Sequence, residues 1–403
     1  AKYDVSCASS GTSRGHKAGA IGSAAGWGIC HSFAEDGRCI SLLKIMLTNY
    51  CRYDCAYCIN RRSNDIPRAT LSVTELVNLT IEFYRRNYIE GLFLSSGVVR
   101  NPDYTMERLV RIVKDLRTIH RFNGYIHLKG IPGASPELIH EAGLYADRMS
   151  VNIEIPNEKS LQTLAPEKDF QSVFTPMRHI QQGVLESAEE RKKYRSAPRF
   201  APAGQSTQMI IGATPDSDKD ILRLSSALYQ RPTMKRVYYS GFVPVNAYDN
   251  RLPQLKQPPL VRENRLYQAD WLLRFYQFKV DEIVDDSYPD LDLEIDPKLA
   301  WALRHPEKFP VDINRADYEL LLRIPGLGVK SAKMIIVSRR YGKINGSQLK
   351  KMGVVLKKAQ YFITCNELPL QTVQELRPER VRQLLIPHKG KQEDPRQLKI
   401  IFE

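Results

Sequence analysis

The chain has 403 residues, of which 42% are hydrophobic, and a formal net charge of +14 at pH 7. This length allows two or three domains with a sizeable core, and the lack of a long apolar run excludes a membrane-spanning protein. The positive charge favours a polyanionic partner such as a nucleic acid. Because the sequence has seven cysteines and shows no signal peptide, we expect a cytoplasmic protein with reduced thiols rather than a disulfide scaffold.

The first part of the chain divides into a glycine-rich extension and a regular α/β region. Residues 1–38 are rich in Gly, Ala and Ser and show no periodicity, so we expect an extension or a lid there. The expected strands are 40–47, 91–97, 124–129, 148–155, 207–212 and 236–242, and the expected helices are 74–88, 106–120, 136–142, 174–188 and 218–230. Six strands joined by helical crossovers predict a parallel sheet, curled into a partial (β/α)6 TIM-like barrel over 39–245.

The rest of the chain is expected to hold a connector and a small all-α domain. Residues 246–310 combine a linker rich in Pro and Gln with a connecting helix at 265–280 that carries five aromatic residues. Helical patterns return at 311–364, and 365–403 reads as a C-terminal tail. The predicted fold class is therefore α/β, with a partial barrel followed by a helical domain.

Three cysteines, Cys51, Cys55 and Cys58, follow the first barrel strand directly. Their Cys-x3-Cys-x2-Cys spacing can supply three thiolates to a [4Fe–4S] cube, which leaves the fourth iron without a protein ligand. S-adenosylmethionine (SAM) can chelate such an iron through its amino group and carboxylate, and its reductive cleavage would release a 5′-deoxyadenosyl radical. A structural zinc site would usually need four ligands, often in Cys-x2-Cys pairs, and the sequence has no second pair.

This cysteine spacing, with the aromatic Tyr57 before the last cysteine, resembles the signature of the radical SAM superfamily. The resemblance implies a partial barrel that binds both cofactors, and we also expect an electron donor such as flavodoxin or ferredoxin. Ser95, Ser96 and Gly97 end the second strand, where the superfamily has a Gly-Gly-Glu-like segment that binds the methionine amino group. The sequence of this chain departs from that segment.

Polar residues on the fourth strand are candidates for holding the SAM cofactor. Ser150, Asn152 and Glu154 alternate along it, so they share one face. Because both faces of a parallel strand are normally covered, we expect this face to point into the barrel. Asn152 and Glu154 are then placed to bind the ribose hydroxyls or the amino-acid moiety.

Two neighbouring strands carry further candidates. His127 and Lys129 alternate on the third strand, and Lys129 can pair with the cofactor carboxylate or with a substrate phosphate. A single histidine such as His127 is more often structural. Gln208 and Gly212 lie on the fifth strand, where a glycine lets the adenine approach the backbone.

A second motif lies at 311–340, around Ile-Pro-Gly-Leu-Gly. One helix, which Asn314 can cap, is expected to stop at Pro325, and a second begins near Val329. Backbone N–H groups of the turn and of the new helix can bind an anion. The predicted DNA-binding residues are Gly326, Leu327, Gly328, Lys330 and Lys333.

This motif resembles the helix-hairpin-helix, which grips nucleic-acid phosphates without reading bases. A degenerate second copy is expected at 347–362, with Ser347 as the cap, and paired copies imply a grip on both strands of a duplex. Residues 311–360 contain 11 Lys or Arg against 3 Asp or Glu. The alternative is a protein–protein helical module.

Together the two motifs resemble a family of radical SAM proteins assigned to DNA modification or repair. Four more segments carry this resemblance, which begin at Ile29, Asp36, Cys58 and Leu164. It implies an enzyme that modifies or repairs a base in duplex DNA by radical hydrogen abstraction, on a flipped or distorted nucleotide. RNA or tRNA as substrate, and a non-catalytic DNA-binding iron–sulfur protein, remain alternatives. The pattern specifies neither the product nor the oligomeric state.

The remaining cysteines lie outside the triad. Cys7, Cys30 and Cys39 precede it, and Cys365 follows the hairpin motif. Such cysteines can bind an auxiliary cluster or donate a hydrogen atom, although free cysteines are often plain buried residues. Cys30 and Cys39 are therefore candidate catalytic residues, together with Lys129 from the third strand.

Overall fold

The computed structural model describes residues 29–33, 39–368 and 372–386. The chain divides into two compact units, one of residues 1–216 and 227–259 and the other of residues 217–226 and 260–403. The first unit thus extends beyond the expected barrel boundary at residue 245. The stretch expected to connect the two domains, 246–310, is shared between the units.

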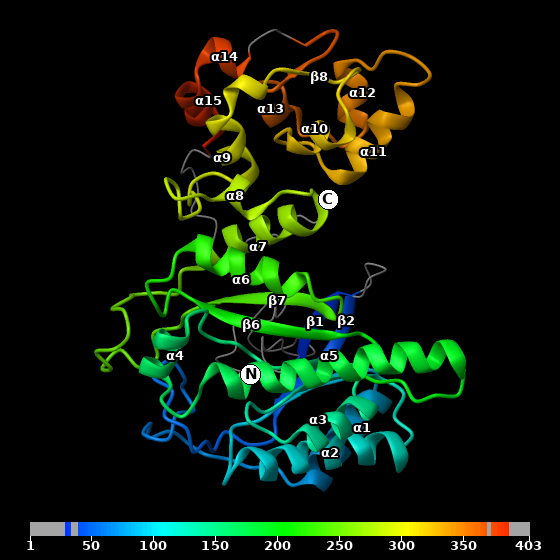
Figure 1. The fold of residues 1–403 in the computed structure, drawn as a ribbon, viewed down its shortest axis with the longest axis vertical. Coiled ribbons are helices and arrows are strands. Elements are labelled where there is room, and N and C mark those ends of the chain that lie inside the picture. The colour runs from blue at the N-terminus through cyan, green and yellow to red at the C-terminus, as the bar shows by residue number, and fades with distance from the viewer. Residues whose placement is uncertain (1–28, 34–38, 369–371, 387–403) are drawn as a thin grey trace, which may run out of the picture. The chain divides into compact units, whose positions relative to one another are not determined.

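The first unit is built on a seven-stranded sheet whose strands follow chain order (Figure 1). They are β1 (Ile29–Phe33), β2 (Cys39–Met46), β3 (Gly91–Ser95), β4 (Tyr125–Lys129), β5 (Arg148–Ser150), β6 (Gln205–Ile211) and β7 (Met234–Gly241). β1 is antiparallel to β2, and every later pair is parallel. β2 to β7 therefore form the expected curled, six-stranded parallel half-barrel.

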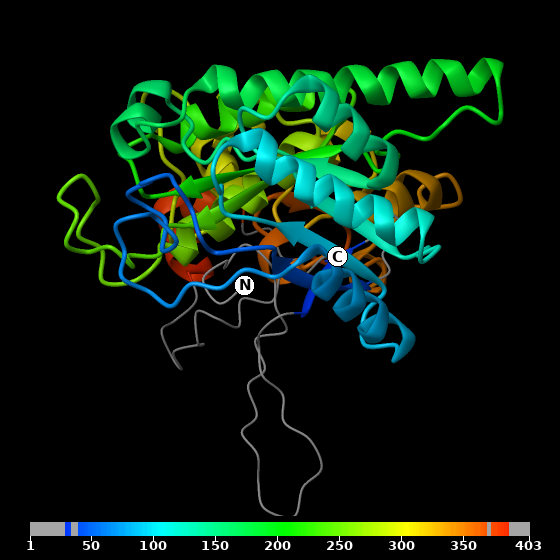
Figure 2. The same ribbon diagram turned by 90° about the horizontal axis from the view of Figure 1, so that it is seen from below.

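Helices cover the outer face of this sheet (Figures 1 and 2). They include α1 (Val73–Arg85), α2 (Pro102–Thr118), α3 (Pro136–Tyr145), α4 (Glu158–Leu164) and α5 (Phe170–Lys193), while α6 (Asp218–Tyr229) is divided between the units. α1, α2, α3 and α5 pack against one another in this order. Ser72 and Asp169 form capping boxes that satisfy the first N–H groups of α1 and α5.

The core of the first unit lies between the sheet and these helices, where the alternate leucine and isoleucine side chains of β3 and β4 are fully buried. Side chains alternate along a strand, so the residues between them lie on the opposite, concave face. The strand register places Lys44, Phe93 and His127 side by side there. The concave face thus carries a row of polar and aromatic side chains.

The second unit is mainly helical. Its helices are α7 (Leu260–Phe275), α8 (Val280–Ile283), α9 (Pro297–Arg304), a 3-10 turn (Pro306–Lys308), α10 (Tyr318–Arg323), α11 (Val329–Ser338), α12 (Gly346–Lys351), α13 (Leu356–Ala359), α14 (Val373–Leu376) and α15 (Pro378–Leu385). Short turns join α10 to α11 and α12 to α13. Strands β8 (Val311–Asp312) and β9 (Ile363–Thr364) pair in parallel at the two ends of this stretch.

Several elements differ from the expected ones. β1 lies where a loop or lid is expected, because its pairing with β2 is a tertiary contact without a local signal. β5 stops at Ser150 instead of Ile155, and the chain rejoins the sheet at an isolated bridge between Glu154 and Met209. α4, α9, α14 and α15 lie in stretches expected to be loop, connector or tail. All four have eight residues or fewer, too few for a clear helical period.

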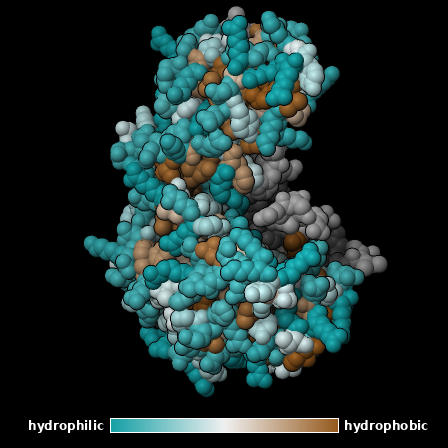
Figure 3. Space-filling model, turned by 45° about the vertical axis from the view of Figure 1, so that its right-hand side comes forward, coloured by the Kyte–Doolittle hydropathy of each residue, from teal (hydrophilic) through white to brown (hydrophobic). Residues whose placement is uncertain are grey.

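None of the helices in the described part of the chain is long and apolar enough to cross a membrane. On the face drawn in Figure 3, most of the surface is hydrophilic and apolar residues form small separate patches. Single exposed apolar side chains are common on protein surfaces and do not by themselves mark a binding site.

Candidate active site

The three predicted cluster ligands lie on one loop at the carboxyl end of β2. Cys51 and Cys58 are half-buried, and Cys55 is 4% exposed. The loop leaves the sheet beside β3, where the N–H of Gly97 donates to the carbonyl of Thr48 at 2.9 Å. The cysteines therefore begin at the edge of the half-barrel where reactive groups of such folds gather.

The end of β3 supports the first cysteine. The N–H of Val98 donates to Sγ of Cys51 at 3.4 Å. Gly97 lies so close to the cysteine loop that a Cβ there would collide with the carbonyl oxygen of Tyr50. The predicted segment 95–97 therefore contacts the cysteine loop directly, and this approach explains its glycine.

The segment that follows α4 supports the middle of the loop. The N–H of Ala56 donates to the carbonyl of Leu164 at 2.7 Å, and the N–H of Asp54 donates to Oε1 of Glu167 at 3.2 Å. Cys55 packs in an apolar cluster that includes Leu161 and Leu164 of α4. The Leu-Ala-Pro-Glu-Lys segment that begins at Leu164 thus docks against the cysteine loop.

Asn246 supports the loop from the stretch expected to be a linker. It is 1% exposed, and its Nδ2 donates to the carbonyls of Ala56 at 2.6 Å and Cys58 at 3.0 Å. Its Oδ1 accepts from Nδ2 of Asn64 at 2.8 Å. Both ends of this buried amide are therefore satisfied, and two of its bonds fix the backbone of the cysteine loop.

A buried arginine joins the same two segments. Arg61 is 5% exposed and pairs with Asp54 on one side and Asp249 on the other, each at 2.6 Å. Its hydrogen bond to Asp54 holds the pKa of that carboxyl well below its ordinary value. Hydrogen bonds from Arg251 and from Arg61 also lower the pKa of Asp249, so both carboxylates stay charged, as a buried guanidinium requires.

The cysteine thiols are strongly affected by burial. It raises the pKa of Cys55 to about 12, although Lys168 opposes the rise, and it also raises the pKa of Cys58. These thiols keep their protons near neutral pH unless a bound metal displaces the protons. Among the described residues, no three His, Cys, Asp or Glu side chains converge on a single-metal position. A [4Fe–4S] cube binds each thiolate through a different iron, so its ligands need not converge on one point.

The loop therefore fits an iron–sulfur cube better than a single metal ion. Cys51, Cys55 and Cys58 would hold three of its irons, and the apolar cluster behind Cys55 would shield it from water on that side. A cube bound there would supply the electron for the reductive cleavage of SAM.

Glu154 connects the half-barrel to the cysteine loop. Its φ is +65°, which is unusual for a residue with a side chain. Its N–H donates to the carbonyl of Gln208 at 2.9 Å, and its carbonyl accepts from the N–H of Ile210 at 2.7 Å. Its Oε2 accepts from the hydroxyl of Tyr57 and, at 2.6 Å, from Nζ of Lys168. We refer to these three side chains as the Tyr57–Glu154–Lys168 network.

Both charges of this network persist in spite of burial. Burial lowers the pKa of Lys168, but the neighbouring Cys55 and Glu154 outweigh it and leave that pKa raised. Burial raises the pKa of Glu154, but Lys168 outweighs it, so the carboxyl pKa is lowered. Burial raises the pKa of Tyr57, which therefore donates as a neutral phenol.

The concave face brings other predicted residues together. Nδ2 of Asn152 donates to Oε1 of Gln208 at 3.1 Å. Nε2 of His127 and Oγ of Ser150 lie 2.9 Å apart. Burial, with help from Arg148, holds the pKa of His127 well below its ordinary value, so the ring is neutral. His127 therefore contacts Ser150 as a neutral ring, and its structural role stays a prediction.

The other predicted cofactor residues lie at strand ends. Lys129 ends β4 and is half-buried, and its charge helps to lower the pKa of Glu154. Oγ of Ser96 donates to the carbonyl of Gly97 at 2.7 Å. Gly212 follows β6 with a φ of +84°. Their roles in binding SAM, like those of Ser95, Asn152 and Glu154, stay predictions.

Two of the candidate catalytic cysteines belong to the first sheet. Cys30 lies on β1 opposite Leu42, and Cys39 begins β2 opposite Phe33. Their side chains and Cys7 lie outside the described residues. Cys365 belongs to the second unit, where its Sγ donates to the carbonyl of Ile344 at 3.1 Å.

In the second unit the predicted hairpin residues form the turn between α10 and α11. Gly326 has a φ of +80°, and a Cβ there would lie 2.7 Å from the carbonyl oxygen of Val355. Gly328 is the N-cap of α11 and has an ordinary φ of −93°. Lys330 and Lys333 are exposed on α11. The turn therefore needs a glycine at Gly326.

A buried lysine holds this turn from α9. Lys298 is 7% exposed, and its Nζ donates to the carbonyl of Leu327 at 2.6 Å. The same ammonium lies 4.6 Å from the centre of the Tyr276 ring. Burial lowers the pKa of Lys298 to about 7. Leu327 is itself buried, so its side chain packs in the unit.

The turn between α12 and α13 repeats the first turn 27 residues later, since Gly353 has a φ of +81° against +80° for Gly326. The same offset pairs Leu322 with Leu349, Leu327 with Val354, Ala332 with Ala359 and Ile335 with Phe362, all of them buried. The two turns touch, because the N–H of Val355 donates to the carbonyl of Gly326 at 2.8 Å. α12 is capped by Asn345, whereas the sequence suggested Ser347.

Some supporting residues were missed by the sequence. Asn246 carries no local signal, because its partners in the cysteine loop lie far away in the chain, and the pairing of Arg61 with Asp249 is equally distant. Lys168 ends the Leu-Ala-Pro-Glu-Lys segment, which could have marked it. Lys357 is exposed and occupies the place of Lys330 in the second repeat, and the 27-residue offset could have found it.

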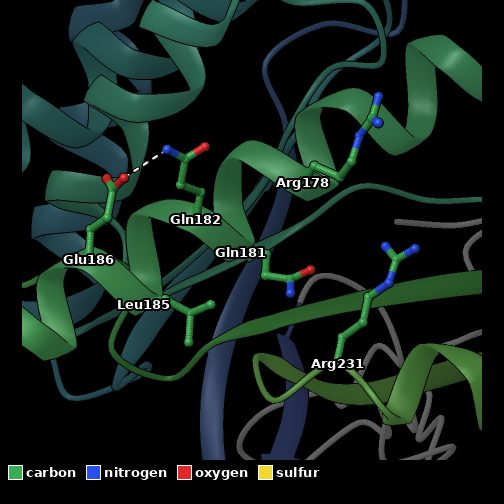
Figure 4. Close-up of a pocket in the computed structure, with 6 residues that line it drawn as sticks. All are labelled: Arg178, Gln181, Gln182, Leu185, Glu186 and Arg231. Atoms are coloured by element: carbon green, nitrogen blue, oxygen red, sulfur yellow. Dashed lines mark hydrogen bonds between the residues drawn. The ribbon is translucent and has the colours of Figure 1, made fainter.

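A pocket of about 440 Å³ lies between α5 and Arg231, which follows α6 (Figure 4). It is lined by Arg178, Gln181, Gln182, Leu185, Glu186 and Arg231. Gln182 uses its Nε2 to bind Glu186 at 2.7 Å. The pocket contains none of the residues predicted for the site.

A parallel half-barrel with three cysteines after its first parallel strand is the arrangement typical of radical SAM domains. Residues 45–228, which run from β2 into α6, match the sequence family described as the Radical SAM superfamily. Residues 45–228 therefore match a radical SAM domain. Enzymes of this superfamily use a [4Fe–4S] cluster and SAM. A comparison with curated proteins finds no match.

Solved structures with a similar fold are distant. HydG, a maturase of the [FeFe]-hydrogenase, has 16% identity and a TM-score of 0.33 over 48% of this chain and 50% of its own. Methylornithine synthase (PylB) has 16% identity and a TM-score of 0.41, with 58% and 61% covered. A radical SAM methyltransferase from Sphaerobacter thermophilus has 14% identity and a TM-score of 0.40, and the match covers 60% of this chain and 69% of its own. The chain thus spans about half to three fifths of the first two proteins.

Proposed function

We propose that this protein is a radical SAM enzyme that acts on DNA, and that it modifies or repairs a base by abstracting a hydrogen atom from it. In this proposal the second unit binds the phosphate backbone of a duplex. The half-barrel of the first unit receives the target nucleotide, which must leave the base stack because a stacked base is inaccessible. A flavodoxin or ferredoxin would supply the electron.

The observation that carries the proposal is the pair of turns in the second unit. Each combines a glycine of positive φ with a short helix whose second residue is an exposed lysine, Lys330 in one and Lys357 in the other. Such pairs resemble helix-hairpin-helix modules. Two equivalent turns in contact with each other are suited to the two phosphate backbones of a duplex.

Charge around these turns supports a polyanionic ligand. Residues 311–360 contain 11 Lys or Arg and 3 Asp or Glu. The lysines that are exposed in this stretch include Lys330, Lys333, Lys343, Lys350, Lys351 and Lys357. Contacts from lysines to phosphates release counterions and carry no base preference. We therefore expect binding to DNA of any sequence.

The concave face of the half-barrel supports an anionic substrate. Lys129 lies there at the carboxyl end of β4, and Lys44 lies near His127. Burial is the largest cause of the lowered pKa of His127, followed by Arg148 and then by these two lysines. These cations can attract a phosphate of the target nucleotide or the carboxylate of SAM. The proposal therefore assigns substrate phosphate contacts to this wall of the half-barrel.

Binding is tested with the full chain and a fluorescent DNA duplex, by anisotropy at several salt concentrations. The logarithm of affinity should fall with the logarithm of salt by about 0.9 per neutralised phosphate. Lys330→Glu with Lys357→Glu should weaken binding and flatten this slope. Lys159→Glu with Lys193→Glu, an equal charge change at exposed sites on α4 and α5, is the control and should leave the slope unchanged.

The reaction is tested by incubating reconstituted protein anaerobically with SAM, reductant and DNA. Mass spectrometry of DNA digests should reveal a changed nucleoside, and chromatography should reveal 5′-deoxyadenosine. A changed nucleoside only in parallel RNA samples would move the substrate to RNA. Binding of DNA without any 5′-deoxyadenosine, from a reduced and intact cluster, would favour a non-catalytic role. If the charge reversals leave DNA binding unchanged, the second unit is a protein-interaction module.

A further inference from the structure

We propose that Lys168 and Glu154 act as an opposed pair of charges that sets the reduction potential of the cluster bound by the cysteine loop. Lys168 favours the reduced cluster and Glu154 favours the oxidised one. Both are positioning residues, because they act on the cluster through space and are not ligands. This inference rests on the radical SAM chemistry of the first unit and not on DNA as the substrate.

Lys168 is fixed beside the cluster ligands. Its ammonium donates to Oε2 of Glu154 at 2.6 Å and lies 5.9 Å from the centre of the Tyr57 ring. Tyr57 itself lies between the ligands Cys55 and Cys58 in the sequence. The side chain is 11% exposed. Its segment is tied to the same loop by the bond from Ala56 to Leu164. The charge therefore cannot move far when the cluster changes its charge.

Glu154 is fixed from the other side. Its N–H and carbonyl both bond to the β6 strand, and its φ is +65°. A non-glycine residue keeps such a backbone only where its surroundings hold it there, which is common at functional sites. Its carboxylate accepts from Tyr57 as well as from Lys168. Tyr57 therefore links the acid directly to the cysteine loop.

The sign of each effect follows from elementary electrostatics. Reduction adds one negative charge to the cluster. A nearby ammonium in a poorly hydrated site stabilises that charge and raises the potential, and a carboxylate lowers it. The net charge around an iron–sulfur cluster is one of the factors that set its potential. A purely structural ion pair would hold the loop in place but would not predict opposite shifts from its two members.

The test measures the midpoint potential of the full chain after anaerobic reconstitution, by redox titration followed by electron paramagnetic resonance, without SAM and without DNA. Lys168→Met should lower the potential and Glu154→Gln should raise it. Each shift is expected to approach a tenfold change in the reduction equilibrium, which is about 59 mV for one electron. Lys168→Arg keeps the charge and should restore most of the potential lost in Lys168→Met. Lys159→Met, at an exposed lysine on α4, is the matched control and should not move it.

Two outcomes would overturn the inference: shifts of the same sign in both variants, or unchanged potentials in variants that keep their iron. If Lys168→Met fails to take up iron, Glu154→Gln and Tyr57→Phe decide the question. Glu154→Gln must still raise the potential, and Tyr57→Phe, which removes a neutral hydroxyl, must shift it much less. Equal shifts in these two variants would mean that the network supports the loop and does not tune the cluster.

Discussion

The cysteine loop of the first unit and the paired turns of the second differ in where their support comes from. The loop is held by Val98, Leu164 and Asn246, which belong to three separate parts of the chain. The turn at Gly326 is held by Val355 of its own repeat partner and by nearby Lys298. One site depends on the completed half-barrel, and the other on contacts within about sixty residues of sequence.

This difference has a chemical reason. A cluster loop must present three thiols in a fixed arrangement and shield them, so it needs contacts from several directions. Under the proposed function, the paired turns must only keep their N–H groups and lysines on the surface, which a local helix pair can achieve. The two regions should therefore respond to substitution in different ways.

The largest expected effect is on the cluster itself. Replacing Cys51, Cys55 or Cys58 by Ala removes a thiolate that no neighbour replaces, so the iron content should fall from about four per chain to near background. Iron analysis after anaerobic reconstitution measures this. Cys365→Ala is the control and should keep its iron, since that thiol lies in the second unit. A triple cysteine variant with full iron would refute the assignment.

The next prediction tests whether the cysteine loop depends on a contact from a distant part of the chain. Asn246→Ala leaves the buried carbonyl of Ala56 without its partner, at roughly 1–3 kcal/mol for a buried group, and removes one of the two hydrogen bonds to the carbonyl of Cys58. We expect a chelator to remove iron several-fold faster from this variant than from the unchanged protein. Asn123→Ala, at an exposed asparagine, should behave like the unchanged protein. Equal rates in all three proteins would show that the loop needs no distant support.

The third prediction concerns the turns. Gly326→Ala forces a Cβ against the carbonyl of Val355 at a positive φ, and should cost roughly 1–3 kcal/mol of stability. Gly328→Ala should cost at most about 1 kcal/mol, because its φ is ordinary and its nearest neighbour is 3.6 Å away. Urea unfolding followed by circular dichroism compares the two. A larger loss in Gly328→Ala would contradict the geometry described for the turn.

The smallest effect is a pH dependence in the second unit. Burial lowers the pKa of Lys298 from 10.5 to about 7, so the unfolded chain binds more protons than the folded one between these values. The contribution of this lysine to stability should therefore rise with pH from about 7 to 10.5. Lys298→Met should flatten that rise, and Lys308→Met, at an exposed lysine, should not. Unfolding at several pH values measures both.

Much of the half-barrel can be predicted from the sequence. Its parallel strands are buried runs separated by amphipathic helices, and that pattern fixes their order without tertiary information. The end of β5 could not be predicted, because Glu154 takes a left-handed backbone that interrupts an alternating pattern. β1 was missed for a similar reason, since only its pairing with β2 makes it a strand.

The ligands of the candidate site could be predicted, but their supports could not. The cysteines form a local pattern, whereas Asn246 lies 190 residues from Ala56 and Arg61 lies 188 residues from Asp249. No local period connects such pairs. In the second unit the important turn residues are neighbours in sequence, so Gly326, Gly328 and Lys330 could be named at once. Even there, Asn345 caps α12 in place of the expected Ser347.

The short pairing of β8 with β9 has a consequence for how the second unit opens. It ties the residues just before the first helix pair to those just after the second, through Val311 with Ile363 and Asp312 with Thr364. The bond between the two turns, from Val355 to Gly326, crosses the middle of the same stretch. Neither half can then fray from a free end, so amide hydrogens in both halves should exchange together, as a single cooperative unit.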